Sequence, residues 1–224
     1  MTLAQGGAGA MASAPAVAYP AGMIWLSSPD DIAASLPAVW LVATPERPAT
    51  LPERSALRRG IGARILARQL GLPPGAIAIG HDARGRPLVE QPRGSRLHLS
   101  LATRAGMVAV ALAHSLVGVD VEAMDARAAT PTAVLHPEES AWLLAQPEDV
   151  RPLAFARLWS AKEAYVKALG TGFARPPESF AVSISPDGRL TVRDGADAAA
   201  ATGVSRTIEN GGQEILAAAI VVIG

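Results

Sequence analysis

The stretch from residue 155 to 172 reads FARLWSAKEAYVKALGTG and constrains the fold more than any other part of the chain. Placed on a helix at about 100° per residue, it gathers its large apolar side chains on one arc, which predicts a helix that faces a core. Lys162 falls inside that arc, Glu163 lies at its edge, and Lys167 lies one turn further on the same side. Gly170 fits the left-handed C-cap at which such a helix ends. The apolar members of the arc are Phe155, Leu158, Trp159, Tyr165, Val166 and Leu169.

Lys162 and Lys167 are the only lysines among the twenty basic residues of the chain, and all the others are arginines. A solvated ion pair between Glu163 and Lys167 is the ordinary interpretation of their spacing. A buried ammonium is costly unless an anion lies nearby. A compact ammonium is also not interchangeable with a guanidinium where a point charge must reach a phosphate or move a proton. We therefore interpret this helix as carrying chemistry as well as packing.

Composition narrows the class of protein. Half of the 224 residues are hydrophobic, and there is no cysteine, which excludes disulfides, thiolate metal sites and a cysteine nucleophile. A formal net charge of zero argues against a general binder of nucleic acid or membrane surfaces. No apolar run approaches the roughly 20 residues of a membrane span, so we expect a cytoplasmic protein. Residues 1–22 lack the features of a secretory signal, and we expect a disordered leader or an early start codon, with Met11 and Met23 as alternatives.

The expected elements follow the order strand, helix and antiparallel strands twice. In the first half we expect a strand at residues 38–44, a helix at 53–70 and three strands at 96–101, 107–112 and 116–122. Residues 23–26 and 76–79 are further candidates for short strands. In the second half we expect helices at residues 137–146 and 155–170 and a pair of strands at 179–185 and 189–193. A loop at 194–203 and a last strand at 215–223 follow. This order predicts an α+β fold of two similar lobes, each an antiparallel sheet packed with a long helix. The predicted N-terminal lobe spans residues 23–123 and the C-terminal lobe 124–224.

Five arginines lie on the helix expected at 53–70. They form a solvated face in the ordinary interpretation. Because no lysine shares this part of the chain, an anion-binding edge is the alternative. These residues are Arg54, Arg58, Arg59, Arg64 and Arg68.

The strand expected at 116–122 reads LVGVDVE. In an extended strand its valines share one face, whereas Asp120 and Glu122 share the other. Two carboxylates on one face repel each other unless a cation or solvent lies between them. Hard cations such as Mg²⁺ bind one or two carboxylates in this way, although the edge of a half-exposed strand gives the same pattern.

The two stretches together resemble the signature of the 4'-phosphopantetheinyl transferases. The family pattern (V/I)-G-(V/I)-D-(V/I)-E, followed by W-x-x-K-E-x-x-x-K-x-x-G, is filled at every position by Gly118–Glu122 and Trp159–Gly170. The resemblance runs from about Val39 to Ile184 and is to the larger class, related to the surfactin synthetase activator, whose chain folds as two pseudo-symmetric lobes. It implies a monomer with its active site at the lobe interface.

The resemblance implies that 4'-phosphopantetheine passes from coenzyme A to a serine of an apo carrier protein of acyl or peptidyl type, releasing 3',5'-ADP. Asp120, Glu122 and Glu163 would bind Mg²⁺. Glu163 would also take the serine proton, and Lys167 would stabilise or protonate the leaving phosphate. Lys162 would hold the phosphates or steady Glu163.

The resemblance also implies contacts with coenzyme A in the first lobe. Arg64 resembles the arginine of the first-lobe helix that reaches the phosphates. Arg86, in Gly-Arg-Pro, resembles the family's Gly-Lys/Arg-Pro turn, and Ser100 matches the serine of the family's Asn-x-Ser-His-Ser/Thr segment. Leu101 and Ala102 replace the histidine and the hydroxyl residue that follow. The lost hydrogen bond to phosphate would weaken binding by about 1.5–3 kcal/mol.

Two other interpretations stay open. A degenerate family member that binds a carrier protein or nucleotide without turnover is favoured by Leu101 and Ala102. An unrelated Mg²⁺-dependent phosphoryl-transfer enzyme would use a nucleoside triphosphate in place of coenzyme A. The complete set of carboxylates and lysines favours the transferase.

Overall fold

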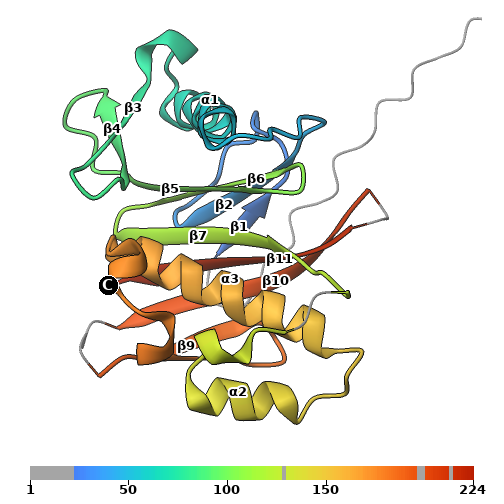
Figure 1. Cartoon of the computed structure of the whole chain (residues 1–224). Coiled ribbons are helices and arrows are strands. Elements are labelled where there is room, and N and C mark those ends of the chain that lie inside the picture. Colours follow the sequence, from blue (N-terminus) through green and yellow to red (C-terminus); the bar gives the residue numbers. More distant parts are fainter. Residues whose placement is uncertain (1–22, 128–129, 196–199, 212–213) are drawn as a thin grey trace, which may run out of the picture.

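The computed structural model describes residues 23–127, 130–195, 200–211 and 214–224. The leader expected at 1–22 lies outside them. The fold is α+β, as predicted: two sheets of mostly antiparallel strands pack against each other, and a long helix covers the outer face of each (Figure 1). The order of layers is therefore helix, sheet, sheet, helix.

The first sheet has the strand order β1-β2-β6-β5. Its strands are β1 (Ile24–Leu26), β2 (Ala38–Ala43), β6 (Met107–Ala113) and β5 (His98–Arg104). Only β1 pairs in parallel. Its outer face packs on α1 (Leu51–Leu70), which begins with a capping box between Thr50 and Glu53 and ends at the left-handed Gly71.

The second sheet has the order β7-β11-β10-β9-β8, and all its pairs are antiparallel. The strands are β7 (Leu116–Ala123), β8 (Ala181–Ile184), β9 (Arg189–Arg193), β10 (Ala201–Asn210) and β11 (Glu214–Ile223). Its outer face packs on α3 (Arg151–Leu169), which ends at Gly170 in the left-handed conformation. The shorter α2 (Pro137–Leu144) packs beside α3 and the edge strand β8. The prediction of a core-facing helix capped by Gly170 is confirmed.

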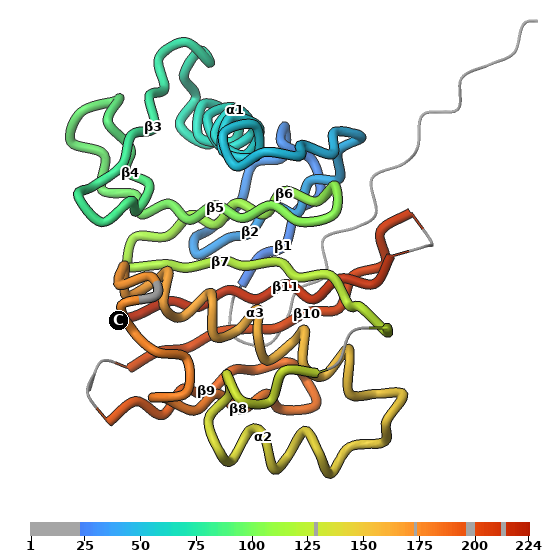
Figure 2. Tube along the Cα trace, in the orientation of Figure 1, coloured from blue at the N-terminus to red at the C-terminus, as the bar shows by residue number. Residues whose placement is uncertain are grey.

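The core between the sheets fixes which way β7 faces. Val117, Val119 and Val121 lie in this core with side chains of β2, β6 and β11. Since side chains alternate along a strand, Asp120 and Glu122 are turned to the other face, toward α3. Figure 2 shows β7 running between the first sheet and β11. Its hydrogen bonds join it to β11, although the predicted division at residue 123 groups it with the first sheet.

The sequence missed two strands. One is β4 (Pro87–Gln91), which pairs with β3 (Ala78–His81) in a separate hairpin. The other is β10, whose first residues, 201–203, were expected to belong to a loop. Four short 3₁₀ turns lie at Pro74–Ala76, Thr132–Val134, Gly172–Ala174 and Pro177–Ser179. No helix in the described part of the chain is both long and apolar enough to cross a lipid bilayer.

Candidate active site

The backbone of α3 lies directly on β7, and glycine makes this approach feasible. A Cβ atom at Gly118 would lie 1.8 Å from the carbonyl oxygen of Ala164 and 2.5 Å from the amide nitrogen of Ala168. Only a residue without a side chain fits under the helix at this point. The close approach brings Glu163 and Lys167 of α3 over the acidic face of β7.

Lys167 and Asp120 form the central contact of this region. Lys167 Nζ donates to Asp120 Oδ1 at 2.6 Å and to the carbonyl oxygen of Val119 at 3.3 Å. The Asp120 side chain is only 8% exposed, whereas that of Lys167 is 31% exposed. Among the residues that the structure describes, Asp120 Oδ2 is buried and has no hydrogen-bond partner. One carboxylate oxygen is therefore neutralised by the chain itself, and the other accepts no hydrogen bond from this part of the chain.

Burial disfavours the ionisation of all three acidic side chains, and the charge of Asp120 adds to this effect at the two glutamates. Burial raises the pKa of Asp120, although the ammonium of Lys167 opposes the shift. Burial, and then the charge of Asp120, raise the pKa of Glu122 to about 7. Burial and Asp120 likewise raise the pKa of Glu163. Arg104, which the sequence did not single out, offsets part of this charge, since its Nε lies 3.3 Å from Glu122 Oε2.

This donor set fits a hard divalent cation. Three carboxyl groups with raised pKa values, together with an unpartnered buried oxygen on Asp120, gain from a positive charge placed among them. Within the described ranges, no three acidic or histidine side chains converge closely enough to hold a metal ion as they stand. The ammonium of Lys167 partly takes the place of a cation beside Asp120.

The pKa of Glu122 predicts a stability change with pH. Between its ordinary value of 4.5 and its raised value of about 7, the folded chain keeps a proton that the unfolded chain releases. The free energy of unfolding is therefore expected to fall as the pH rises through this window, by an amount on the order of 3 kcal/mol for this group. Urea denaturation across the window measures the slope. In Glu122→Gln, which cannot ionise, the slope is expected to lose the share of this group and to keep the shares of Asp120 and Glu163, whose pKa values are also raised. An unchanged slope would assign it to those groups alone.

A cavity of about 170 Å³ adjoins this cluster. It lies between α1, the β3–β4 turn, β5 and the C-terminal end of α3, and three arginines line it: Arg58, Arg84 and Arg86. Lys167 also reaches it, so the cavity and the acidic cluster share a residue. The arrangement places an arginine-lined space next to a group of carboxylates, with Lys167 between them, which suits a ligand that carries phosphates and a metal ion.

Two of the predicted coenzyme A contacts line this cavity. Arg86 Nη2 donates to the carbonyl oxygen of Leu169 at 2.6 Å and thereby ties the β3–β4 turn to the end of α3. Ser100 Oγ accepts from the amide of Val119 at 3.0 Å, joining β5 to β7 beside Asp120. Leu101, at the position of the family histidine, also lines the cavity and is buried against α1.

The other two predicted contacts lie elsewhere. Arg64 pairs with Asp30 at the surface, its Nε donating to Oδ1 at 2.9 Å, and it is not among the residues that line the cavity. Arg58, six residues earlier on the same helix, lies there instead. Lys162 points away from Asp120 into a buried contact with Glu139. The arginine-rich pattern of α1 was the available signal, but it did not identify which arginine faces the cavity.

Comparison with known proteins adds to this geometry. Residues 116–219 match the model of the 4'-phosphopantetheinyl transferase superfamily. Proteins named 4'-phosphopantetheinyl transferase from Bacillus subtilis, Bacillus pumilus and a Nostoc species are 28%, 30% and 30% identical over 127, 130 and 139 residues. These matches cover 56%, 58% and 57% of this chain and 56%, 55% and 56% of the relatives. The chain thus spans about half the length of the curated relatives it matches.

The matched segment runs from the start of β7 into β11 and includes the whole of α3. It therefore contains both elements that face each other across the acidic cluster. Arg58, Arg86 and Ser100 lie before it. By this match and these relatives, the segment that holds β7 and α3 is similar to the 4'-phosphopantetheinyl transferase superfamily.

Proposed function

We propose that this chain is an enzyme that transfers the 4'-phosphopantetheine group of coenzyme A to a serine of an apo acyl or peptidyl carrier protein. The observation that carries the proposal is the acidic cluster of β7 and α3, which shares Lys167 with an arginine-lined cavity. A pyrophosphate repels an incoming oxygen nucleophile, so a transfer site needs cations around it. The named relatives support the same activity.

In this proposal Asp120, Glu122 and Glu163 hold Mg²⁺, with Asp120 Oδ2 as the oxygen that now lacks a partner. When bound, the ion neutralises the pyrophosphate of coenzyme A as negative charge develops. Glu163, whose pKa is raised by burial and by Asp120, takes the proton of the carrier serine, directly or through a water molecule.

The reaction forms a bond between the serine oxygen and the phosphorus on the pantetheine side. It breaks the bond between this phosphorus and the bridging oxygen of the pyrophosphate. The leaving group is 3',5'-ADP. Lys167, partly exposed in the cavity wall, stabilises or protonates its new phosphate oxygen. Arg58, Arg84 and Arg86 bind the phosphates, and Ser100 supports the site by holding β7 to β5.

The further expectations belong to this proposal. The chain is a monomer of two lobes, residues 23–123 and 124–224, with the site at their interface, where β7 of the first lobe lies against α3 of the second. The chain acts in the cytoplasm on coenzyme A and a carrier protein, without nucleic acid or a membrane.

Intact mass spectrometry tests the activity directly. The chain is incubated with an apo carrier protein, coenzyme A and Mg²⁺, and an EDTA sample serves as the control. A metal-dependent mass gain of one phosphopantetheine group on serine is the expected result. No gain across fatty acid, polyketide and peptide carriers, with coenzyme A binding intact, would support a binding module instead.

The binding module is favoured by one observation. Leu101 puts an apolar side chain into the cavity where the family has a histidine, and Ala102 follows it. A module that docks a carrier protein without turnover has less need of the phosphate contact that the family histidine provides. Nucleoside triphosphate consumption in place of coenzyme A would instead identify a different phosphoryl-transfer enzyme.

Lys167→Arg separates charge from shape. The guanidinium keeps the positive charge, but it is bulkier and cannot lose a proton near neutral pH. Since Lys167 bonds both Asp120 and Val119 at short range, kcat is expected to fall about tenfold, as measured by the rate of carrier modification. Near-normal turnover would show that compactness and proton transfer do not matter at this position.

A further inference from the structure

A second buried ion pair lies on the side of α3 away from Asp120. Lys162 Nζ contacts both carboxylate oxygens of Glu139, on α2, at 2.7 Å. The side chains are 1% and 3% exposed. The pair joins α2 to the middle of α3.

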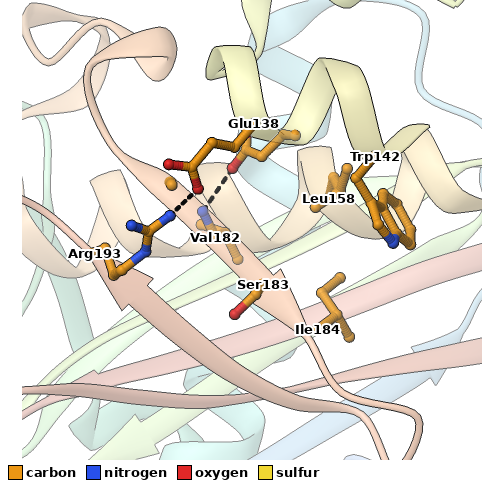
Figure 3. Close-up of a pocket in the computed structure, with 9 residues that line it drawn as sticks. Glu138, Trp142, Leu158, Val182, Ser183, Ile184 and Arg193 are labelled. Atoms are coloured by element: carbon orange, nitrogen blue, oxygen red, sulfur yellow. Dashed lines mark hydrogen bonds and ion pairs between the residues drawn. The ribbon is translucent and has the colours of Figure 1, made fainter. Parts of the chain in front are cut away.

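Each partner is also bonded to the backbone. Lys162 Nζ donates to the carbonyl oxygen of Phe180 at 2.8 Å and lies 4.3 Å from the centre of its ring. Glu139 accepts from the amide of Val182, on the outer edge of β8, at 2.6 Å and from the amide of His136 at 2.9 Å. Figure 3 shows the bond to Val182 beside the exposed pair of Glu138 and Arg193. Lys162 is thus held from α2 and from the start of β8.

Such a pair is a weak choice for stability alone. Removing two buried charges from water is costly, and apolar residues of similar volume often serve as well or better. An ion pair differs from an apolar contact in being directional, because its hydrogen bonds require particular positions of donor and acceptor. The geometry of this pair therefore constrains α3 more tightly than apolar packing does.

The constraint acts on neighbouring residues of the helix. Glu163 follows Lys162 directly and projects about 100° further around the helix axis. Lys167 lies four residues beyond Glu163 and so on the same face. If Lys162 is fixed, the rotation of α3 is fixed, and with it the direction in which Glu163 and Lys167 point.

We propose that Glu139 and Lys162 are positioning residues, whose buried pair sets the rotation of α3 so that Glu163 and Lys167 face Asp120. Neither residue touches the substrates. The kinetic consequence rests on the proposed transferase function, whereas the geometric consequence does not. This assigns a role to Glu139 and replaces the predicted phosphate contact of Lys162.

The double variant Glu139→Gln/Lys162→Met tests the proposal. It removes both charges at similar volume, and Gln keeps an acceptor for the amide of Val182. Circular dichroism and the melting temperature are expected to stay near those of the wild type. We expect kcat for phosphopantetheine transfer to fall about 100-fold, as for a small misplacement of reacting groups. KM for coenzyme A stays within about threefold, because the arginines of the cavity are untouched.

A second readout is independent of turnover. Lys162→Met leaves Lys167 as the only lysine, so reductive methylation with ¹³C-formaldehyde labels one side-chain amine, distinct from the N-terminus. In the wild type, which also has Lys162, the Lys167 signal is the one that is absent from Lys167→Arg, and it reports the contact with Asp120. In the double variant the signal is expected to move to the position found in Asp120→Asn, where the carboxylate partner is absent.

Arg193→Gln is the matched control, because it breaks the neighbouring pair with Glu138, whose members are 65% and 61% exposed, without touching α3. It is expected to change neither readout. A folded double variant with wild-type kcat and an unmoved Lys167 signal would overturn the proposal. If the double variant does not fold, Lys162→Met alone decides through the same two readouts, since it also leaves Lys167 as the only lysine. If the wild type transfers nothing, the proposed function fails, and the Lys167 signal still decides the positioning.

Discussion

Replacing Glu163 by glutamine is expected to leave the fold intact and to slow phosphopantetheine transfer by about 1000-fold. Glutamine keeps the size of the side chain but cannot accept the serine proton. It also removes one of three carboxylates that carry the proposed Mg²⁺ site. Since the charge of Asp120 raises the pKa of Glu163, losing the carboxylate also relieves repulsion. Mass spectrometry of the carrier protein gives the rate, and the melting temperature is expected to hold or rise.

Metal binding provides the second measurement on Glu163→Gln. Titration with Mn²⁺, followed by its paramagnetic resonance signal, is expected to show a much weaker site than in the wild type. Glu148→Gln, in the exposed connection between α2 and α3, is the matched control and is expected to change neither rate nor affinity. Retained turnover in Glu163→Gln would remove Glu163 from both proposed roles.

Periodicity in the sequence predicted which residues share a face of β7 and which share a face of α3, and the family resemblance implied that the two faces meet. Alternation along LVGVDVE put Asp120 and Glu122 on the face of β7 opposite its valines. The helical period put Glu163 and Lys167 together on one side of α3. Those patterns hold because each element has one face in a core. The valines of β7 lie between the sheets, the C-terminal half of the apolar arc of α3 packs on the second sheet, and its N-terminal half packs with α2. A local pattern suffices wherever burial on one face decides the orientation.

Lys162 shows where local patterns stop. Its place inside the apolar arc correctly predicted burial, but its partner, Glu139, lies 23 residues away on another helix. Only tertiary packing brings the two together, so the sequence supported a phosphate contact equally well. Arg58 and Arg64 are a similar case, because both lie on α1 and only the fold determines which one faces the cavity.

The missed strands have a different cause. In β10 only part of the strand is buried, and its sequence, ATGVSRTIEN, mixes small and polar residues, with Gly203 near its start. This segment forms a strand because ten of its residues pair with β11, which is rich in alanine and isoleucine and is buried along most of its length. Strand formation here depends on the neighbour more than on intrinsic preference.

The second large effect is expected from Gly118→Ala, on β7. The added methyl group would meet the backbone of α3 at Ala164 and Ala168, at 1.8 and 2.5 Å. Backbone cannot move aside as a flexible side chain does, so α3 must shift away from β7. We expect the free energy of unfolding to fall by about 3 kcal/mol, as for an overpacked core. The shift also separates Lys167 from Asp120, and kcat is expected to fall about 100-fold in the fraction that remains folded.

Gly60→Ala is the matched control, because nothing lies within 4 Å of a Cβ atom at this exposed position of α1. There the same substitution is expected to stabilise the chain by about 0.5–1 kcal/mol, since alanine favours a helix more than glycine does. Urea denaturation of both variants gives the two free energies. A Gly118→Ala chain with wild-type stability and turnover would mean that α3 does not rest on β7. In that case the contact between Lys167 and Asp120, on which the proposed site depends, would lose its structural basis.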